Sequence, residues 1–254
     1  MWTAARERVP CPPVRALIGT SDVGTAYAVQ RRNLERAAAG GRRVAGRKIG
    51  LTSPAVQRQL GVDEPDFGAL LADAEVPDGG EADLARLLQP RIEAEVALVL
   101  GADLTDPDCG ADDVRAAVAR LHPALEIVDS RVADWDITLV DTVADNASAG
   151  LYVLGGDGRP PLPGDGDLSG VRMLMRRGTE TVSQGSGADC LGGPLLAARW
   201  LAVTLARLGD PLRAGDVVLT GALGPVVPVA PGDVFTAELT GLGEVSVRFP
   251  PAKK

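Results

Sequence analysis

Two glutamates stand one residue apart in an apolar segment, and this spacing could bring both carboxylates to one ion. The segment is QPRIEAEVALVL, residues 89–100, and the glutamates are Glu93 and Glu95. Its β-branched and apolar residues predict a buried strand, on which residues two apart point to the same face. A buried pair of carboxylates needs a compensating cation, because each carboxylate raises the pKa of the other. The pattern favours a divalent metal site; the alternative, common for an isolated E-x-E, is the solvated face of an edge strand.

A third glutamate, Glu126, lies among apolar residues in the next predicted strand, HPALEIVDS, residues 122–130. A polar loop and a helix at about residues 112–121 separate the two strands. A single buried-looking glutamate is weak support for a site. Three carboxylates on two strands joined by a helical crossover could converge on one ion, and they favour the metal site over the solvated edge strand.

Histidine and lysine are scarce, which limits the acid–base chemistry available. His122 is the only histidine, so a Ser-His-Asp triad or a histidine-rich zinc site is difficult to build. Lysine occurs only at Lys48, Lys253 and Lys254, although the chain has 26 basic residues. A desolvated lysine can lose its proton and an arginine cannot. Lys48 is therefore a candidate acid–base residue, with chance retention of one internal lysine as the alternative.

Composition and charge exclude several classes of partner. The chain has 254 residues, of which 45% are hydrophobic, enough for a full core. Its net charge of −8 and the lack of a basic stripe argue against a nucleic-acid partner. No apolar run approaches the roughly 18 residues of a membrane helix, and the first residues lack the apolar core of a signal peptide. We expect a cytoplasmic protein with no membrane partner, whose cysteines are widely spaced free thiols, namely Cys11, Cys109 and Cys190.

The candidate residues require particular elements to position them. Ser21 is a suitable N-cap for a helix that extends to about Ala39. Residues 42–51 predict a strand that contains Lys48 near its end. Residues 53–61 predict a short helix, because serine and proline open it and glycine ends it.

Two later segments are rich in polar or turn-forming residues. Residues 61–71 place Asp66 between proline and phenylalanine, a poor setting for regular structure, and loops of this kind often have functional roles. Residues 135–150 contain side chains that could line a cavity or form Asx-type turns, namely Asp141, Asp145, Asn146 and Ser148.

The C-terminal half predicts mainly scaffold. A hairpin turns at Arg177-Gly178 and is interpreted as a surface excursion. Residues 194–207 predict an amphipathic helix with core-facing leucines. Two Gly-Asp-Val turns, at Gly215 and Gly232, precede strands of a predicted antiparallel sheet.

Four long segments, in order along nearly the whole chain, match the pattern of a known family. They are GRKIGLTSPAVQRQLGVDEPDFG from Gly46, QPRIEAEVALVLG from Gln89, HPALEIVDSRVADWDITLVDTVADNASAG from His122 and AGDVVLTGALGPVVPVAPGDVF from Ala214. Together they resemble the 2-oxopent-4-enoate hydratases, enzymes of aromatic meta-cleavage catabolism within the fumarylacetoacetase superfamily.

The resemblance implies roles for the candidate residues. It makes Glu93, Glu95 and Glu126 the ligands of Mg²⁺ or Mn²⁺, as hard oxygen donors suit these ions. It implies that Lys48 and Asp66 are an acid–base pair. It also implies a polar pocket residue and a substrate loop, namely Ser148 and Thr220-Gly221-Ala222. Ala222 stands where many hydrolases of the superfamily have a hydroxyl residue, which argues against hydrolase chemistry.

The resemblance also implies an architecture. The expected fold is α+β, a fumarylacetoacetase-like mixed β-roll with surrounding short helices. Residues 1–41 would form a helical segment packed on a catalytic domain of residues 42–254, and relatives commonly have a longer N-terminal helix. The expected assembly is a homo-oligomer built from dimers.

The implied reaction is the addition of water to 2-hydroxypenta-2,4-dienoate, which gives 4-hydroxy-2-oxopentanoate. To act as a base, Lys48 would need a pKa lowered towards neutrality. The nearest alternative is the sister decarboxylase of 2-oxo-hex-3-enedioate (4-oxalocrotonate), whose second carboxylate would need a cation that the sequence does not identify. Further alternatives are a hydratase for a larger dienol, an acylpyruvate hydrolase and a non-catalytic partner subunit.

Overall fold

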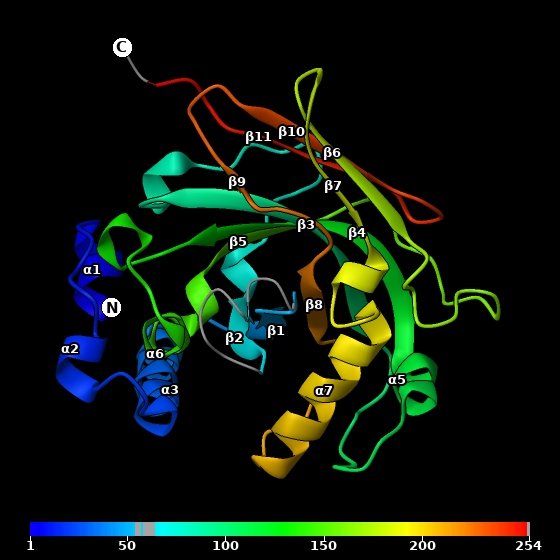
Figure 1. Ribbon diagram of the computed structural model, residues 1–254, viewed down its shortest axis with the longest axis horizontal. Coiled ribbons are helices and arrows are strands. Elements are labelled where there is room, and N and C mark those ends of the chain that lie inside the picture. The colour runs from blue at the N-terminus through cyan, green and yellow to red at the C-terminus, as the bar shows by residue number, and fades with distance from the viewer. Residues whose placement is uncertain (54–56, 58–63, 253–254) are drawn as a thin grey trace.

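Two β-sheets form the body of the protein (Figure 1). The structure is a computed structural model that describes residues 1–53, 57 and 64–252. In the larger, seven-stranded sheet the strands follow the order β2-β1-β8-β3-β4-β5, with β9 beside β3. Its strands are β1 Val44–Gly50, β2 Asp66–Leu71, β3 Pro90–Leu100, β4 Val118–Asp129, β5 Ala149–Leu154, β8 Val217–Ala222 and β9 Val227–Pro228.

The smaller sheet covers one face of the larger one. Its four strands follow the order β11-β10-β6-β7, and β10 and β11 contact β4. Phe235, Val247 and Met175 of this sheet are fully buried in the same hydrophobic core as Leu125 of β4. Its strands are β6 Arg172–Arg177, β7 Glu180–Ser186, β10 Val234–Leu239 and β11 Gly243–Arg248.

Helices surround the larger sheet. In Figure 1, α3 and α6 lie together on the left, and α7 lies with α5 on the right, where α7 packs against β8 and β1. The helices are α1 Trp2–Glu7, α2 Arg15–Ile18, α3 Val23–Ala39, α5 Ala111–Ala117, α6 Leu139–Ala144 and α7 Pro194–Arg207. Single 3₁₀ turns are η1 Ala72–Ala74, η2 Leu84–Arg86, η3 Ala133–Trp135, η4 Asn146–Ser148 and η5 Gly187–Asp189.

The larger sheet is curled and of mixed direction. β1 and β8 run parallel, whereas the other paired strands of this sheet are antiparallel. The two end strands of the order, β2 and β5, also contact each other, so the sheet bends back on itself. The expected mixed β-roll with surrounding short helices is confirmed.

Several predicted elements are confirmed by the structure. The strand predicted at residues 42–51 is β1, the strand with the paired glutamates is β3, and the helix predicted at residues 194–207 is α7. All three cysteines are free thiols, as expected. These elements have a strong period of 2 or 3.6, or unambiguous end signals, which explains why the sequence predicts them well.

Two predicted boundaries are wrong. The N-cap of α3 is Asp22, not Ser21, because the Asp22 carboxylate accepts a hydrogen bond from the Thr25 N–H at 2.9 Å. The helix predicted at residues 112–121 ends at Ala117, since the following residues pair with β3 from Val118 onwards. The two glutamate strands are therefore antiparallel neighbours, and α5 is their connection rather than a crossover between parallel strands.

Asp66 lies at the start of a strand, whereas the sequence favoured an irregular loop. It is the first residue of β2 and pairs with Gly50 of β1. Proline and glycine are tolerated here because Pro65 precedes the strand and β2 is at the edge of the sheet. The short helix predicted at residues 53–61 falls largely on residues 54–56 and 58–63, outside the described residues.

The hairpin of β6 and β7 is not a surface excursion. β6 pairs with β10, and its Met173 and Met175 side chains are buried. The expectation of an antiparallel C-terminal sheet holds for β10 and β11 but not for β8, which runs parallel to β1. Both errors concern pairing between distant segments, which local patterns do not encode.

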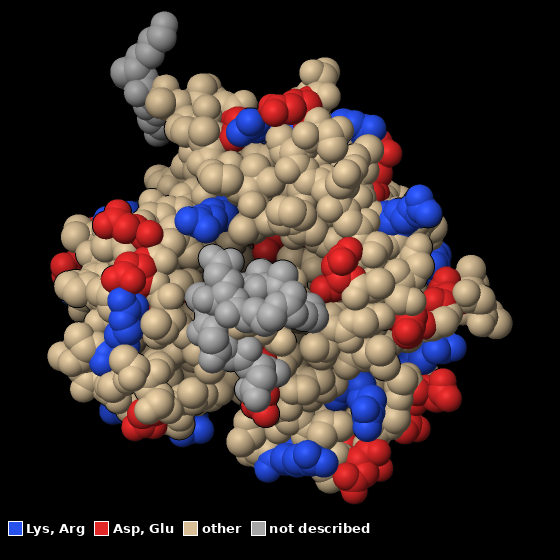
Figure 2. Space-filling model, in the orientation of Figure 1, with Lys and Arg blue, Asp and Glu red and all other residues tan. Residues whose placement is uncertain are grey.

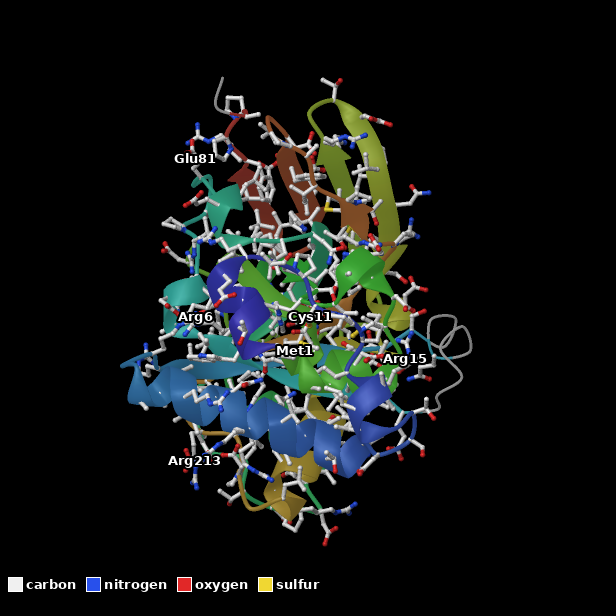
Figure 3. The ribbon with its side chains drawn as sticks, turned by 90° about the vertical axis from the view of Figure 1, so that its left-hand side faces the viewer. Met1, Arg6, Cys11, Arg15, Glu81 and Arg213 are labelled. Carbon is white, nitrogen blue, oxygen red and sulfur yellow. The ribbon has the colours of Figure 1, made fainter. Side chains whose placement is uncertain are left out.

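The N-terminal residues pack on the edge of the roll (Figure 3). Ala26 of α3 shares an apolar cluster with Val140 and Val143 of α6. Tyr27 stacks on Phe67 of β2, with ring centroids 4.6 Å apart. Helix α3 therefore packs against β2, the strand that begins with Asp66. None of the described helices is both long and apolar enough to cross a membrane.

The contact between β1 and β8 is close enough to require glycine at position 46. A Cβ on Gly46 would lie 1.9 Å from the Val217 carbonyl oxygen, a backbone atom. We expect Gly46→Ala to lower the free energy of unfolding by at least about 2 kcal/mol in urea denaturation. Gly24→Ala is the control, because Gly24 is exposed on α3 and its Cβ would lie 3.6 Å from the nearest atom, Asp22 Oδ1. The control should be neutral or stabilising by up to about 1 kcal/mol. Equal unfolding midpoints for the two variants would contradict this packing.

Candidate metal centre and active site

The three candidate ligands converge at the centre of the larger sheet. Glu93 of β3 and Glu126 of β4 are direct partners in the antiparallel register, and Glu95 lies two residues along on the same face. One carboxylate oxygen from each residue lies within 4.8 Å of the other two. Glu95 and Glu126 are fully buried, whereas Glu93 is half-buried. Figure 2 shows an acidic side chain at the floor of a recess near the middle of the displayed face.

The carboxylates of this cluster have oxygen atoms that lack hydrogen-bond donors. Among the described residues, Glu95 Oε1 and Glu126 Oε2 are buried without a hydrogen-bond partner, and Glu126 Oε1 has an ion pair with Lys48 but no well-aligned hydrogen bond. Within the part of the chain that the structure describes, Glu95 Oε2 is the one carboxylate oxygen of these three residues that accepts a main-chain donor, the Gly221 N–H at 2.6 Å. Burying charged oxygens without partners is costly, and a hard divalent cation is the ligand that such a donor set suits. The residues present therefore fit a divalent metal ion.

Burial and mutual repulsion raise the pKa values of the three carboxyl groups. Burial raises the pKa of Glu93 from its ordinary 4.5 to about 7, with the charge of Glu126 as the next cause. Burial, then Glu126 and Glu93, raise the pKa of Glu95 well above its ordinary value. Burial also raises the pKa of Glu126, against the opposing effect of Lys48. A bound cation would reverse these effects, because it favours the ionised carboxylates.

Lys48 projects from β1 into the same cluster. Its side chain is 3% exposed, and its Nζ lies 3.3 Å from Glu126 Oε1. The Lys48 Nζ also donates a hydrogen bond to the Ala147 carbonyl oxygen at 3.0 Å. Burial lowers the pKa of Lys48, but the charges of Glu126, Asp66, Glu93 and Glu95 together outweigh burial and raise it. In the ion-free protein the described side chains therefore do not provide the lowered pKa that a basic Lys48 would need.

Asp66 lies beside Lys48, above the backbone of Gly50. A Cβ on Gly50 would lie 2.1 Å from Asp66 Oδ1 and 3.6 Å from Lys48 Nζ, so both groups occupy the space above Gly50. Asp66 is 1% exposed, and its Oδ1 has no hydrogen-bond partner among the described residues. Burial raises the pKa of Asp66, although Lys48 opposes this effect. The absence of a side chain at Gly50 thus leaves room for the Asp66 carboxylate and the Lys48 ammonium to lie together.

Ser148 is linked to Asp66 through a threonine. Ser148 Oγ lies 3.5 Å from Thr142 Oγ1, which in turn lies 3.4 Å from Asp66 Oδ2. Both distances are at the long end for hydrogen bonds between hydroxyl and carboxylate groups. All three side chains are buried, and they form a polar row beside the carboxylate cluster.

The stretch Thr220-Gly221-Ala222 is the end of strand β8 rather than a loop. The Thr220 hydroxyl donates to the Val96 carbonyl at 2.8 Å, so its proton is used within the sheet. Gly221 supplies the N–H that binds Glu95, and Ala222 is paired with Glu95 in the strand register. In the structure these residues support a candidate metal ligand.

Other conspicuous polar residues form ion pairs away from the cluster. Asp141 binds Arg15 at 2.7 Å, and Arg15 is labelled in Figure 3. Asp145 binds Arg131 at 2.6 Å. Both aspartates are buried and paired, so they anchor segments of the chain.

Sequence reasoning missed three contributors to the site: the Ala147 carbonyl, the Thr142 hydroxyl and the missing side chain at Gly50. The first is a backbone atom and the third is the absence of a side chain, so neither has a side-chain signal. Thr142 could have been found from its position in the polar segment of residues 135–150.

Comparisons with known proteins identify relatives over nearly the whole chain. Residues 51–249 match the family described as Fumarylacetoacetate (FAA) hydrolase C-terminal. A 2-keto-4-pentenoate hydratase 1 from Dechloromonas aromatica (strain RCB) is 55% identical over 237 residues, which cover 93% of this chain and 89% of that protein. A 2-keto-4-pentenoate hydratase from Paraburkholderia xenovorans (strain LB400) is 52% identical over 249 residues, 98% of this chain and 92% of that protein.

Two further relatives differ in reaction or substrate. A 2-hydroxyhexa-2,4-dienoate hydratase from Comamonas testosteroni is 43% identical over 229 residues, 89% of this chain and 86% of that protein. The structure of 4-oxalocrotonate decarboxylase from Pseudomonas putida G7, complexed with magnesium and adipate, superposes with a TM-score of 0.92. It is 37% identical, and the superposition covers 97% of this chain and 93% of that one.

The raised pKa values predict how pH and metal affect stability. Between pH 4.5 and about 7 the folded ion-free protein keeps a proton on Glu93 that the unfolded chain has released. The free energy of unfolding of the ion-free protein should therefore fall as pH rises through this window. A cation competes with these protons, so Mg²⁺ or Mn²⁺ should raise the melting temperature more at about pH 8 than at about pH 5.

Thermal melts with and without the metal test this prediction. Glu126→Gln should remove most of the metal-dependent shift. Glu238→Gln is the matched control, because Glu238 is a surface residue of β10 paired with Arg176 at 2.6 Å, and it should keep the full shift. The same shift in both variants would show that the metal binds elsewhere.

Proposed function

The chain belongs to the fumarylacetoacetate hydrolase family, and we propose that within this family it is a hydratase that adds water to 2-hydroxypenta-2,4-dienoate and forms 4-hydroxy-2-oxopentanoate. The single observation that supports this most directly is the buried cluster of Glu93, Glu95 and Glu126 beside Lys48 and Asp66. The relatives at 52–55% identity that are named hydratases support the choice of reaction.

The proposed cofactor is Mg²⁺ or Mn²⁺, held by Glu93, Glu95 and Glu126. The orphaned oxygens of Glu95 and Glu126 support a divalent ion, as does the magnesium named in the decarboxylase complex. When bound, the ion would supply positive charge next to the 2-oxygen of the substrate, where negative charge develops as the dienol loses its proton.

The chain's own residues handle the protons of the reaction. The dienol loses its O–H proton, and the far carbon C5 gains one, which gives the conjugated 2-oxo-3-enoate. Water then adds across this double bond, with the hydroxyl at C4 and the proton at C3. We assign the catalysis of these steps to Asp66 and Lys48, the two buried ionisable groups above Gly50, with Asp66 as the group that exchanges protons.

The electrostatic environment gives Lys48 and Asp66 different roles. In the ion-free protein the carboxylates around Lys48 raise its pKa, and we assign Lys48 the role of a positive charge and hydrogen-bond donor. Burial raises the pKa of Asp66, which suits it to exchange a proton with carbon or water through its free Oδ1. Ser148 and the end of β8 around Thr220, Gly221 and Ala222 would complete the substrate pocket.

The decarboxylase of 2-oxo-hex-3-enedioate is the second candidate, because its structure superposes over nearly the whole chain. Its identity of 37% is lower than the 55% of the hydratase, which favours the hydratase. A third candidate is a hydratase for a dienol one carbon longer, which the 43% identical relative supports. The absence of a hydroxyl at Ala222 argues against a hydrolase, and the retained ligands argue against a non-catalytic subunit.

The remaining proposals concern assembly, location, metabolic role and domain organisation. We propose a homo-oligomer built from dimers, a cytoplasmic location and a role in aromatic meta-cleavage catabolism. We also propose residues 1–41 as a helical segment packed on a catalytic domain of residues 42–254, supported by the packing of α3 on α6 and on Phe67.

Direct assay tests the proposed reaction. With freshly generated 2-hydroxypenta-2,4-dienoate and Mg²⁺ or Mn²⁺, we expect loss of the dienol absorbance and a product heavier by one water. In D₂O the product should have one deuterium in its C5 methyl group, because C5 is protonated during ketonisation. Release of CO₂ from 2-oxo-hex-3-enedioate, with the pentadienoate left unchanged, would instead assign the protein to the decarboxylases.

Substitution of the acid–base pair tests the assigned roles. Lys48→Met and Asp66→Asn should each lower kcat by about 100-fold or more, since each removes a positioned charge or proton-transfer group. Arg213→Met is the control, because the Arg213 side chain forms an exposed pair with Asp103 at 2.8 Å, and it should leave kcat unchanged. A Lys48→Met variant with kcat close to that of the wild type would remove Lys48 from the mechanism.

A further inference from the structure

Three consecutive non-glycine residues beside the site adopt the left-handed backbone conformation. The φ angles of Asn146, Ala147 and Ser148 are 58°, 51° and 54°. This conformation is unfavourable for residues that have a Cβ atom, and runs of it are rare because only isolated residues visit it readily. Strained backbone of this kind persists only where the surrounding structure holds it, and such strain clusters at functional sites. What holds this turn, and what the turn positions, are therefore informative.

The side chain of Asn146 fastens the turn to strand β2. Asn146 Oδ1 accepts a hydrogen bond from the Ala69 N–H at 2.8 Å, and Asn146 Nδ2 donates to the Ala69 carbonyl at 2.9 Å. Because β2 is an edge strand, the Asn146 amide occupies the place that a neighbouring strand would take. The Asn146 side chain thus satisfies one hydrogen-bond donor and one acceptor at the edge of the sheet. These two bonds hold the turn against β2.

The turn also lies very close to the backbone of β2. A Cβ on Gly68 would lie 2.3 Å from the Asn146 carbonyl oxygen and 3.2 Å from the Ala147 Cβ. Only glycine at position 68 allows this approach. Gly68 is also the register partner of Lys48 on β1, so the turn sits above the strand pair that supports Lys48.

The strained turn aims one backbone carbonyl at the Lys48 ammonium. The Ala147 carbonyl accepts a hydrogen bond from Lys48 Nζ at 3.0 Å, whereas the other described contact of Nζ is with Glu126 at 3.3 Å. An ammonium group on a flexible four-carbon stem needs such contacts to keep a fixed direction. With only the carboxylates as partners, Nζ would be drawn into the cluster and away from the space above Gly50.

We propose that Asn146 is a positioning residue: its side-chain amide holds the strained turn whose Ala147 carbonyl fixes the Lys48 ammonium beside Asp66 and Glu126. The proposal rests on the proposed function, in which Lys48 acts on the substrate. Asn146 itself touches neither substrate nor metal in this account and acts through Ala147.

The lysine content of the chain allows a direct observation of Lys48. The chain has only two other lysines, Lys253 and Lys254, so the side-chain ammonium spectrum of ¹⁵N-lysine-labelled protein should contain few signals. We expect one slowly exchanging signal in the Mg²⁺-loaded protein, which Lys48→Arg should remove and thereby assign. In Asn146→Gly the left-handed backbone remains allowed but the amide is lost, so the Lys48 signal should shift and exchange faster with water.

Two further variants separate positioning from general stability. Asp78→Ala is the matched control, since Asp78 also makes two side-chain hydrogen bonds to the backbone, with Gly156 and Ser246, but at an exposed place. It should leave the Lys48 signal and kcat unchanged. Asn146→Asp keeps an acceptor for the Ala69 N–H and tolerates the left-handed conformation, so it should restore part of the Lys48 signal.

The kinetic readout gives the expected size of the effect. Asn146→Gly should lower kcat by about 10- to 100-fold with less than about a threefold change in KM or in the Mg²⁺ concentration for half-activity, because a misplaced group affects the chemical step. Asn146→Asp should recover part of kcat. An unchanged Lys48 signal and kcat in Asn146→Gly, with a loss of melting temperature like that of Asp78→Ala, would overturn the proposal.

The test also distinguishes this proposal from the proposed function. If the wild type does not hydrate the dienoate but the Lys48 signal still depends on Asn146, the positioning of Lys48 by Asn146 stands and the assigned reaction fails. If the wild type is an active hydratase and neither the Lys48 signal nor kcat depends on Asn146, the reaction stands and the positioning role fails. Should Asn146→Gly not fold, the same comparison applies to Asn146→Asp.

Discussion

The rest of the structure depends on the compensation of buried negative charge at the centre of the larger sheet. Four carboxylates, those of Glu93, Glu95, Glu126 and Asp66, act on the single ammonium of Lys48. One ammonium group does not balance the negative charge of four carboxylates. In agreement with this excess of negative charge, Glu95 and Glu126 have buried carboxylate oxygens without hydrogen-bond partners among the described residues. A protein interior tolerates such a cluster only if it is protonated or holds a metal ion. The same charges that favour a metal ion thus raise the pKa of Lys48 in the ion-free protein.

The curl of the larger sheet makes this cluster possible. Lys48 lies on β1 and Glu126 on β4, and β8 and β3 lie between these two strands. Three strand spacings of about 4.8 Å would put their backbones roughly 14 Å apart in a flat sheet. The observed 3.3 Å between Lys48 Nζ and Glu126 Oε1 therefore requires both the reach of a lysine and a sheet that bends towards its own concave face. Helix α7 packs on β8 and β1 of this sheet, and the smaller sheet packs on β4 through β10 and β11.

Backbone groups near the site also contact its charged side chains, and some of the residues there have a left-handed conformation. Leu51, directly after Gly50, has a φ of 55°, and the turn of residues 146–148 is left-handed throughout. These residues lie at strand or helix ends, where main-chain groups are free to serve the site: the Ala147 carbonyl binds Lys48 and the Gly221 N–H binds Glu95. Much of the polar environment is therefore built from peptide groups, which have fixed positions and need no side-chain ordering.

The sequence by itself determined the elements with strong periodicity and the chemistry of their side chains. The strand with Glu93 and Glu95, helix α7 and the scarcity of lysine and histidine all follow from residue types and spacing, and the family resemblance added proposed roles for Asp66 and Ser148. Only the tertiary structure decided that Asp66 begins a strand, that β8 runs parallel to β1 and that Ala147 faces Lys48. These facts depend on contacts between residues far apart in the chain and on backbone atoms that every residue shares. A local pattern contains no information about either.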